Sequence, residues 1–258
     1  NSERVLSAEA AKLFFLEVYD LSRMEGWASD QHFTADGTLI EAWASLKSFT
    51  RKDGADQKKV DLAKKDDPSN PTINFHGEKR SNQTHQSTTD PQSVLYRKAK
   101  GKESKLCFGV HALMENRHGL CAQIDVHNPI AQGEADVALA QVDQHTQLHG
   151  ARVKTLGTDK GYHHRKFVNG CRERGISPHA ACKEKVSVAG LDGRTTQAQG
   201  YKTGHRIRKR VEEIFGWMKT VGGLRRTRYR GLAPPPAWAY FVGSAYNLLR
   251  ITRLAAAS

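Results

Sequence analysis

The sequence predicts an α/β fold in which a mixed sheet packs against helices. Strand-like runs alternate with helical patterns along the 258 residues, and no internal repeat is visible. Hydrophobic residues make up 38% of the chain and charged residues 26%, a composition that can bury a large core. We therefore expect one domain that spans residues 1–258.

The first predicted element is an amphipathic helix over roughly residues 7–25. Its apolar residues recur at helical spacing and form one stripe, which we expect to face the core. The predicted stripe consists of Leu13, Phe14, Val18 and Leu21.

The first predicted strand lies in the run from His32 to Phe49. Phe33, Ala35 and Leu39 fall on one face at a period of two, whereas Asp36 falls on the other face. A single aspartate on the wet face of an edge strand is common. Asp36 therefore becomes a candidate site residue only if other carboxylates lie near it in the fold.

The next stretch, about residues 50–104, is rich in charge, Ser, Asn and Pro. Such a composition buries little surface, so we expect either a surface insertion or a partly disordered segment. Beyond it the pattern predicts a hairpin from Leu106, a helix over about 131–148, a strand over 153–158, a helix after Gly161, a short strand near 176–181 and two long helices. We expect the last part of the chain, about residues 203–258, to be basic and helical.

The charge balance points to a polyanionic partner. Lys and Arg number 40 against 27 for Asp and Glu, which gives a net charge of +13. Nucleic acid is the leading candidate and an anionic membrane the second. No apolar run approaches the ~18 to 20 residues of a membrane span, and no signal pattern opens the chain. The four cysteines lack CxxC spacing, so we expect reduced, structural thiols in an intracellular protein.

A second carboxylate, Asp159, lies where a predicted strand ends and a helix follows. Ligands bind near the carboxyl ends of strands in open α/β sheets. An aspartate at that place also serves as a helix cap, so its position alone does not decide its role.

A third carboxylate, Glu212, lies in the predicted helix from His205 to Lys219. Arg208, Glu212 and Lys219 fall on one flank of this helix, at the border of the core face, while Glu213 points to the far side. The alternative is a salt-bridged surface stripe, in which an i, i+4 pair contributes only ~0.3 to 0.5 kcal/mol.

Asp36, Asp159 and Glu212 together make an acidic triad that suits two divalent cations. Mg²⁺ and Mn²⁺ prefer carboxylate oxygen and keep waters, so three carboxylates suffice when a substrate phosphate supplies further ligands. Two such ions about 4 Å apart activate an attacking oxygen and stabilise a leaving one. The triad therefore predicts phosphodiester chemistry.

The segment from His205 to Arg230 holds nine Lys or Arg residues and two acids. We expect it to contact the DNA backbone, which supplies affinity without sequence specificity. A solvated basic loop is the alternative. The proposed contacts in its second half are Arg225, Arg226, Arg228 and Arg230.

The C-terminal helical run, after three prolines, carries an apolar and aromatic pattern that we interpret as core packing rather than a base-stacking platform. The expected core residues are Trp238, Phe241, Val242, Ala245, Leu248 and Leu249.

Two possible zinc sites are not supported by their spacing. His145 and His149 are four residues apart, but no Glu follows the first His. Cys171, His179 and Cys182 match no familiar zinc pattern. We expect structural roles for all five.

Three blocks of the sequence resemble bacterial insertion-sequence transposases of the DDE type, in the superfamily that includes insertion sequences four and five. The blocks are FTADGTLIEAWASLKSF, LGTDKGYHHRKFV and RIRKRVEEIFGWMKTVGGLRRTRYRGL, and LYRKAKGKESKLCFGVHALMENRHGL is similar to the family's linking segment. Their combination in this order is highly specific, and the resemblance covers most of the chain.

The resemblance implies a ribonuclease-H-like mixed sheet flanked by helices, with a long polar insertion after the first strand. It implies that Asp36, Asp159 and Glu212 are the catalytic residues and the ligands of two Mg²⁺ or Mn²⁺ ions. The family's Tyr-Arg-Glu-Lys signature is matched by Arg208, Glu212 and Lys219, whereas His205 stands at the Tyr position.

The activity implied by the resemblance is DNA transposition: metal-dependent cleavage at the element's ends, followed by strand transfer to target DNA. The implied setting is the bacterial cytoplasm beside the nucleoid, with a possible homodimer on paired ends. We expect this chain to lack the N-terminal helical domain that family members usually carry. A truncated DNA-binding remnant without activity, and a simple metal-dependent nuclease, remain open as alternatives.

Overall fold

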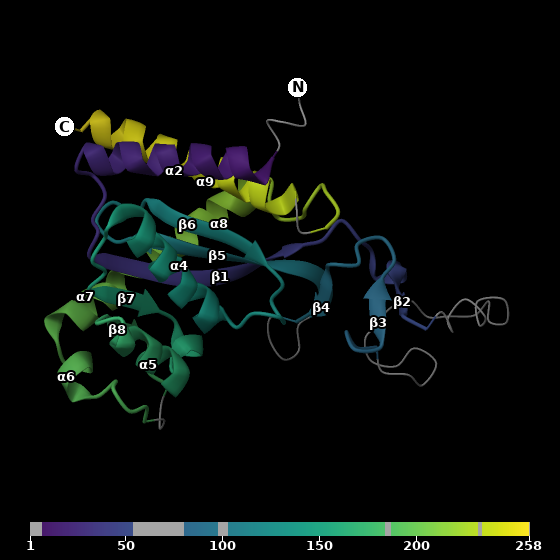
Figure 1. Ribbon diagram of the computed structural model, residues 1–258, viewed down its shortest axis with the longest axis horizontal. Coiled ribbons are helices and arrows are strands. Elements are labelled where there is room, and N and C mark those ends of the chain that lie inside the picture. Colours follow the sequence, from purple (N-terminus) through teal and green to yellow (C-terminus); the bar gives the residue numbers. More distant parts are fainter. Residues whose placement is uncertain (1–6, 54–79, 98–102, 184–186, 232–233, 258) are drawn as a thin grey trace.

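The computed structural model describes residues 7–53, 80–97, 103–183, 187–231 and 234–257. Helices cover a mixed sheet on both faces (Figure 1). The helical elements are α2 (Ala8–Met24), η1 (Leu46–Ser48), α4 (Glu134–His149), η2 (Lys160–Tyr162), α5 (Arg165–Glu173), α6 (Gly193–Thr196), α7 (Gln199–Ile207), α8 (Arg210–Thr220) and α9 (Pro234–Ala255). The strands are β1 (His32–Glu41), β2 (Phe49–Arg51), β3 (His85–Ser87), β4 (Val94–Tyr96), β5 (Lys105–Glu115), β6 (Cys121–His127), β7 (Thr155–Thr158) and β8 (Ser177–Ala180).

The main sheet has the strand order β4-β5-β1-β7-β8, and β6 also pairs with β5. Strand β5 is antiparallel to β1, β4 and β6, whereas β7 is parallel to both β1 and β8. The hairpin of β5 and β6 follows from two apolar runs joined by a turn at Gly119, whose φ is +71°. A mixed sheet of this order, flanked by helices, confirms the predicted ribonuclease-H-like fold.

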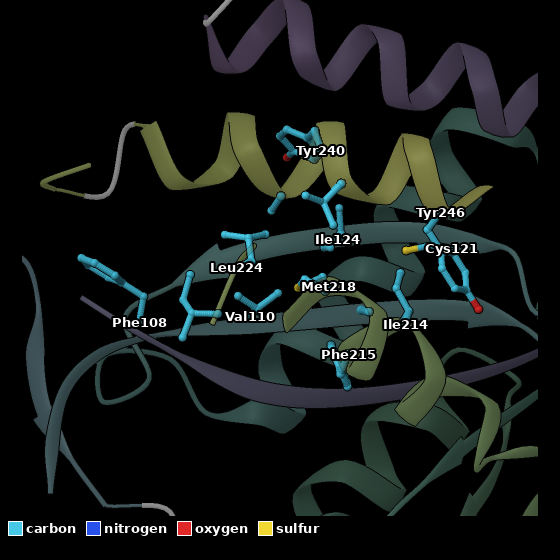
Figure 2. Packing of buried hydrophobic residues seen from close by; sticks show 14 of the residues in the cluster. Phe108, Val110, Cys121, Ile124, Ile214, Phe215, Met218, Leu224, Tyr240 and Tyr246 are labelled. Carbon is cyan, nitrogen blue, oxygen red and sulfur yellow. The ribbon is translucent and has the colours of Figure 1, made fainter. Parts of the chain in front are cut away.

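Two apolar cores sandwich the sheet. On one face, Val110 and Ile124 of the sheet lie against Met218 of α8 and Tyr240 of α9, as Figure 2 shows. On the other face, α4 and α5 cover a core that includes Leu113 of β5. Because successive residues of a strand point to opposite faces, each residue of β1 and β5 is assigned to one of these two layers.

The expectation that Asp36 lies on a wet face opposite an apolar one is wrong. Strand β1 is central, with β5 on one side and β7 on the other, and both of its faces are covered. Phe33 belongs to the core under α4, while Ile40, on the same face as Asp36, belongs to the core under α8. Asp36 is consequently half-buried inside the fold rather than solvated at an edge.

The polar stretch of about 50–104 is more structured than predicted. Residues 54–79 and 98–102 lie outside the described residues, but residues 85–87 form β3 and residues 94–96 form β4. Strand β4 pairs with the start of β5 and so extends the main sheet.

The single helix predicted from His205 to Lys219 is divided. Helix α7 ends at Ile207 and α8 begins at Arg210, with the Glu212 amide bonded to the carbonyl of Lys209 in a tighter turn. The two residues between the helices keep right-handed helical angles, so the flank that carries Arg208 and Glu212 remains in register.

The buried faces of the first and last helices match the predicted stripes only in part, since Val18 and Val242 are buried as predicted. Helix α2 buries Phe15 and Tyr19 while Leu13, Phe14 and Leu21 are exposed. Helix α9 exposes Ala245, Leu248 and Leu249. Its buried Asn247 instead bonds the N–H and the carbonyl of Cys121 at the edge of β6, which fixes the face that α9 presents. Within the described residues, none of the helices has the length and apolarity that a membrane crossing requires.

Candidate active site

The sheet register brings Asp36 and Asp159 together. Strands β1 and β7 are parallel, with Thr34 opposite Gly157, and Asp159 follows β7 directly. Asp36 and Asp159 each follow this last pair by two residues, and both line the same cleft. Asp36 falls on the face of β1 that α8 covers, because it alternates with Ile40 of the core under α8.

Short backbone turns orient the two carboxylates. Asp36 Oδ1 accepts the N–H of Gly37 at 2.8 Å. Asp159 caps the short helix η2, and its Oδ1 accepts the N–H of Gly161 at 2.6 Å. A Cβ on residue 161 would lie 2.8 Å from that same oxygen, so glycine permits this close approach. Within the described parts of the chain, these hydrogen bonds engage only Oδ1 of each aspartate.

Helix α8 brings Glu212 to the same face. Val211, Ile214 and Met218 are buried against the sheet, which turns Glu212 toward the open side. Its neighbour Glu213 points away and bonds Arg250 at 3.2 Å, as predicted for the far side of the helix.

Lys219, at the end of α8, donates a hydrogen bond of 2.5 Å to Thr38 Oγ1. Thr38 lies two residues beyond Asp36 on the same face of β1, so this contact ties α8 to the strand that carries Asp36. The predicted flank of Arg208, Glu212 and Lys219 thus faces one place in the fold.

The carboxylates and basic side chains described above line one cleft of about 850 Å³. Strands β1 and β5, the turn after β7, and α8 contribute to its walls. The charged residues of the lining are Asp36, Glu134, Asp159, Lys160, Arg208, Glu212 and Lys219. The structure therefore places all three predicted carboxylates and two predicted basic residues in one cleft.

The cleft disfavours the charged form of Asp36. Burial raises the pKa of Asp36 to about 6, and the nearby charges of Asp159 and Glu134 act in the same direction. The Gly37 N–H and the Arg208 guanidinium act against this rise. A cation beside Asp36 would relieve the repulsion between these carboxylates.

Glu134 is a cleft residue that the sequence reasoning missed. It is the first residue of α4, and a Cβ on Gly37 would lie 3.4 Å from its Oε1. The only available signal was an acidic residue at the start of a predicted helix, which usually means favourable interaction with the helix dipole. Its proximity to Asp36 depends on the tertiary fold.

The donor set fits a divalent cation. Aspartate and glutamate supply hard oxygen ligands, and Asp36, Asp159 and Glu212 line the same cleft. Among the described residues, however, no group of three or more His, Cys, Asp or Glu side chains is arranged so that it could hold a metal ion. Mg²⁺ and Mn²⁺ keep waters and take ligands from a substrate phosphate, so they need few protein ligands held in place before the substrate binds.

His205 lies outside the set of residues that line the cleft. Its ring packs edge-on against Tyr201, with ring centres 4.3 Å apart, and burial lowers its pKa. His205, which stands where the resemblance implies a Tyr, is therefore half-buried against Tyr201 and does not line the cleft.

The predicted basic segment lies beside the end of β1. The Glu41 N–H donates to the carbonyl of Arg225, and the Thr227 N–H donates to the carbonyl of Glu41, so the segment pairs with the end of β1. The guanidinium of Arg226 lies 5.2 Å from the ring centre of the exposed Trp43. The exposed residues of this segment include Arg225, Arg226, Arg228 and Arg230.

Comparison with protein families identifies the chain. The family model described as the transposase DDE domain matches residues 74–248, which is more than half of the sequence. Asp159 and Glu212 lie within the match, whereas Asp36 precedes it. A search of curated proteins found no match. The chain belongs to the transposase DDE domain family, a class of nucleases and strand transferases that act on DNA with divalent metal ions.

Proposed function

We propose that the chain is the single catalytic domain of a bacterial insertion-sequence transposase, and that Asp36, Asp159 and Glu212 are its catalytic metal ligands. The observation that supports this most strongly is geometric. Asp36 of β1, Asp159 directly after the parallel strand β7, and Glu212 of α8 line one cleft.

In this proposal the three carboxylates hold two Mg²⁺ or Mn²⁺ ions. When bound, such ions supply Lewis acidity for the attacking and leaving oxygens of a phosphodiester. The chain's own part is to hold the carboxylates at fixed places and to hold the DNA strand across the cleft. Cleavage at the element's end would release a 3′-hydroxyl, and this hydroxyl would then attack target DNA at the same site.

Arg208 has the properties of a phosphate contact in the cleft. Its Nε is buried, and no hydrogen-bond partner for it exists within the described part of the chain. A buried donor without a partner is costly, and a phosphate oxygen would satisfy it. Lys219, held toward β1 by Thr38, would add a second positive charge near the scissile group.

The exposed arginines beside β1 would extend the DNA path away from the cleft. Residues 36–39 of β1 line the cleft, and the pairing of Glu41 with the segment of Arg225 to Thr227 follows directly along that strand. Phosphate contacts from Arg225, Arg226, Arg228 and Arg230 would hold the duplex without reading its sequence. A homodimer on paired ends, in the bacterial nucleoid, is the assembly that we propose by family analogy.

The test separates cleavage from joining. The chain is incubated with supercoiled plasmid and a labelled duplex oligonucleotide with free 3′-hydroxyl ends, in Mn²⁺ or in EDTA. We expect nicked plasmid and labelled plasmid in Mn²⁺, and neither product in EDTA.

The other outcomes decide between the alternatives. Nicking without labelled plasmid would favour a metal-dependent nuclease over a transposase. Plasmid binding with neither product would contradict the proposed activity and favour a DNA-binding remnant.

A further inference from the structure

A buried network of hydrogen bonds is centred on His111, a residue of β5 that lines the same cleft as Glu212, and no role proposed above uses it. His111 of β5 is fully buried, with Nδ1 2.8 Å from Gln141 Oε1 and Nε2 2.5 Å from Tyr162 Oη. Gln141 Nε2 also donates to the carbonyl of His111 at 3.0 Å and to Asp125 Oδ2 at 2.7 Å.

One backbone carbonyl determines which atoms donate and which accept in the hydrogen bonds of His111, Gln141 and Tyr162. The carbonyl of His111 can only accept, so the NH₂ group of Gln141 must face it, and Gln141 Oε1 must face His111 Nδ1. Nδ1 therefore carries the ring proton. Burial lowers the pKa of His111 to about 4, so the ring is neutral and Nε2 is an acceptor. Tyr162 must then donate its hydroxyl proton to His111.

The link between His111 and Tyr162 crosses β1 at Gly37. His111 lies directly opposite Gly37 in the pairing of β5 with β1, and Tyr162 belongs to η2, which follows β7 on the other side of β1. A Cβ on residue 37 would lie 3.2 Å from His111 Cδ2, a close contact. The glycine beside Asp36 therefore leaves room for the histidine ring to reach across the strand.

The link joins the elements that carry the two aspartates. Tyr162 follows Asp159 by three residues in the same turn, and its phenol experiences the charges of Glu134, Asp36 and Asp159. Because the Tyr162 proton is donated to His111, it is not offered to a cleft carboxylate. The carboxylate oxygens stay available to a cation.

We propose that Tyr162 and His111 are positioning residues, whose hydrogen bond across Gly37 holds the Asp159 turn at a fixed distance from Asp36. This inference rests on the proposed metal site and deepens it. Supporting partners of metal ligands commonly change metal affinity or activity by about 10- to 100-fold when they are lost.

The experiment compares Tyr162→Phe with Tyr246→Phe. Tyr246 lies on α9, bonds Arg250 through its hydroxyl at 3.1 Å, and lies outside the residues that line the cleft, so its variant removes one comparable hydrogen bond elsewhere. We measure the dissociation constant of Mn²⁺ without DNA by electron paramagnetic resonance, the Mn²⁺ concentration for half-maximal nicking, and the melting temperature. Tyr162→Phe should weaken both Mn²⁺ values about 10-fold or more. Tyr246→Phe should leave them unchanged.

Wild-type Mn²⁺ affinity in Tyr162→Phe would overturn the inference. Should that variant fail to fold, Gly37→Ala serves instead, because it keeps every hydrogen-bonding group. Its Cβ would press on His111 Cδ2 at 3.2 Å, whereas its 3.4 Å distance to Glu134 Oε1 is an ordinary contact. It should weaken Mn²⁺ binding in the same direction.

Nuclear magnetic resonance of the His111 ring gives a readout that does not depend on activity. The inference predicts the Nδ1–H tautomer in the wild-type protein, and an Nε2–H tautomer would contradict it. A wild-type chain that binds Mn²⁺ but never nicks DNA would count against the proposed function alone. A wild-type chain that binds no Mn²⁺ would contradict both.

Discussion

Asp36 is a carboxylate whose charged form the metal-free fold disfavours. Its raised pKa arises from burial and from the neighbouring Asp159 and Glu134. Active sites commonly hold such destabilising groups because function requires them. The site is therefore expected to gain stability when its charge is removed or neutralised.

Asp36→Asn should accordingly raise the melting temperature of the metal-free protein while abolishing nicking. Removal of the buried charge relieves its desolvation and its repulsion, and 1 kcal/mol corresponds to about 2–4 °C in a chain of this size. The check is thermal unfolding in EDTA beside plasmid nicking in Mn²⁺. Asp143→Asn, which changes a surface carboxylate paired with Arg174, is the control and should leave nicking intact. A lower melting temperature for Asp36→Asn would show that its carboxylate is not under strain.

The sequence predicted Asp36, Asp159 and Glu212 as candidates from their order along strand, turn and helix, and the three side chains line one cleft. Glu134 and Tyr162 could not be found in this way. Glu134 read as an ordinary first-turn acid, and Tyr162 as an ordinary aromatic, because their nearness to Asp36 depends on how β5, β1 and β7 pair. Residues that act across strands are visible only once the register is known.

Helix α8 depends on its buried face to present Glu212. Met218→Ala should lower the free energy of unfolding by about 2–5 kcal/mol, because Met218 is fully buried between the sheet and α9. Val221→Ala, just past the end of α8 and 70% exposed, is the matched control and should change it by less than about 0.5 kcal/mol. Urea unfolding of both variants measures the difference. Equal effects would mean that α8 is not anchored through this face.

The contact between α2 and α4 contains a buried histidine. His145 is fully buried beside Phe33, and neither ring nitrogen has a hydrogen-bond partner among the residues the structure describes. Burial lowers its pKa to about 3, and the charges of His149 and Arg23 also lower it. Asp30 opposes this shift but does not cancel it.

The consequence is a loss of stability in acid. Between pH 6.5 and about 3 the unfolded chain binds a proton at His145 that the folded protein does not bind. The free energy of unfolding should therefore fall as the pH drops below 6.5, by about 1.4 kcal/mol per pH unit for this group. Above pH 6.5, His145 should not change the free energy of unfolding. Melting temperatures from pH 7.5 to 5 should decline less steeply for His145→Leu than for the wild type. Identical slopes would exclude His145 as a source of acid sensitivity.

At the level of elements, periodicity located the helices and strands but not always their buried faces. Helices α2 and α9 have apolar residues on more than one side, so the sequence alone did not determine which side is buried. The choice was made by tertiary contacts, such as the packing of Phe15 on Tyr240 and the bonds of Asn247 to β6. The break between α7 and α8 also left no sequence signal, because neither Gly nor Pro marks it.

Across the whole molecule, the net charge of +13 predicts DNA binding that weakens steeply with salt. Arg228→Gln should reduce the slope of log affinity against log salt by about 1, because it removes one phosphate contact. Arg194→Gln, which changes an exposed arginine on α6 paired with Asp192, should leave the slope unchanged. Titrations of a fluorescent duplex at several salt concentrations measure both slopes. Equal slopes for the two variants would show that the segment beside β1 is not part of the DNA path.

The central claim is that Asp36, Asp159 and Glu212 act together as one metal-binding site. Its most direct test is Mn²⁺-dependent nicking of supercoiled plasmid by the wild-type chain and by Asp36→Asn, Asp159→Asn and Glu212→Gln, with DNA binding measured in parallel. Glu213→Gln, on the far side of the same helix, is the control. We predict a loss of at least about 100-fold in nicking for the three variants, with DNA binding retained and Glu213→Gln active. Wild-type nicking by any of the three variants would contradict the account.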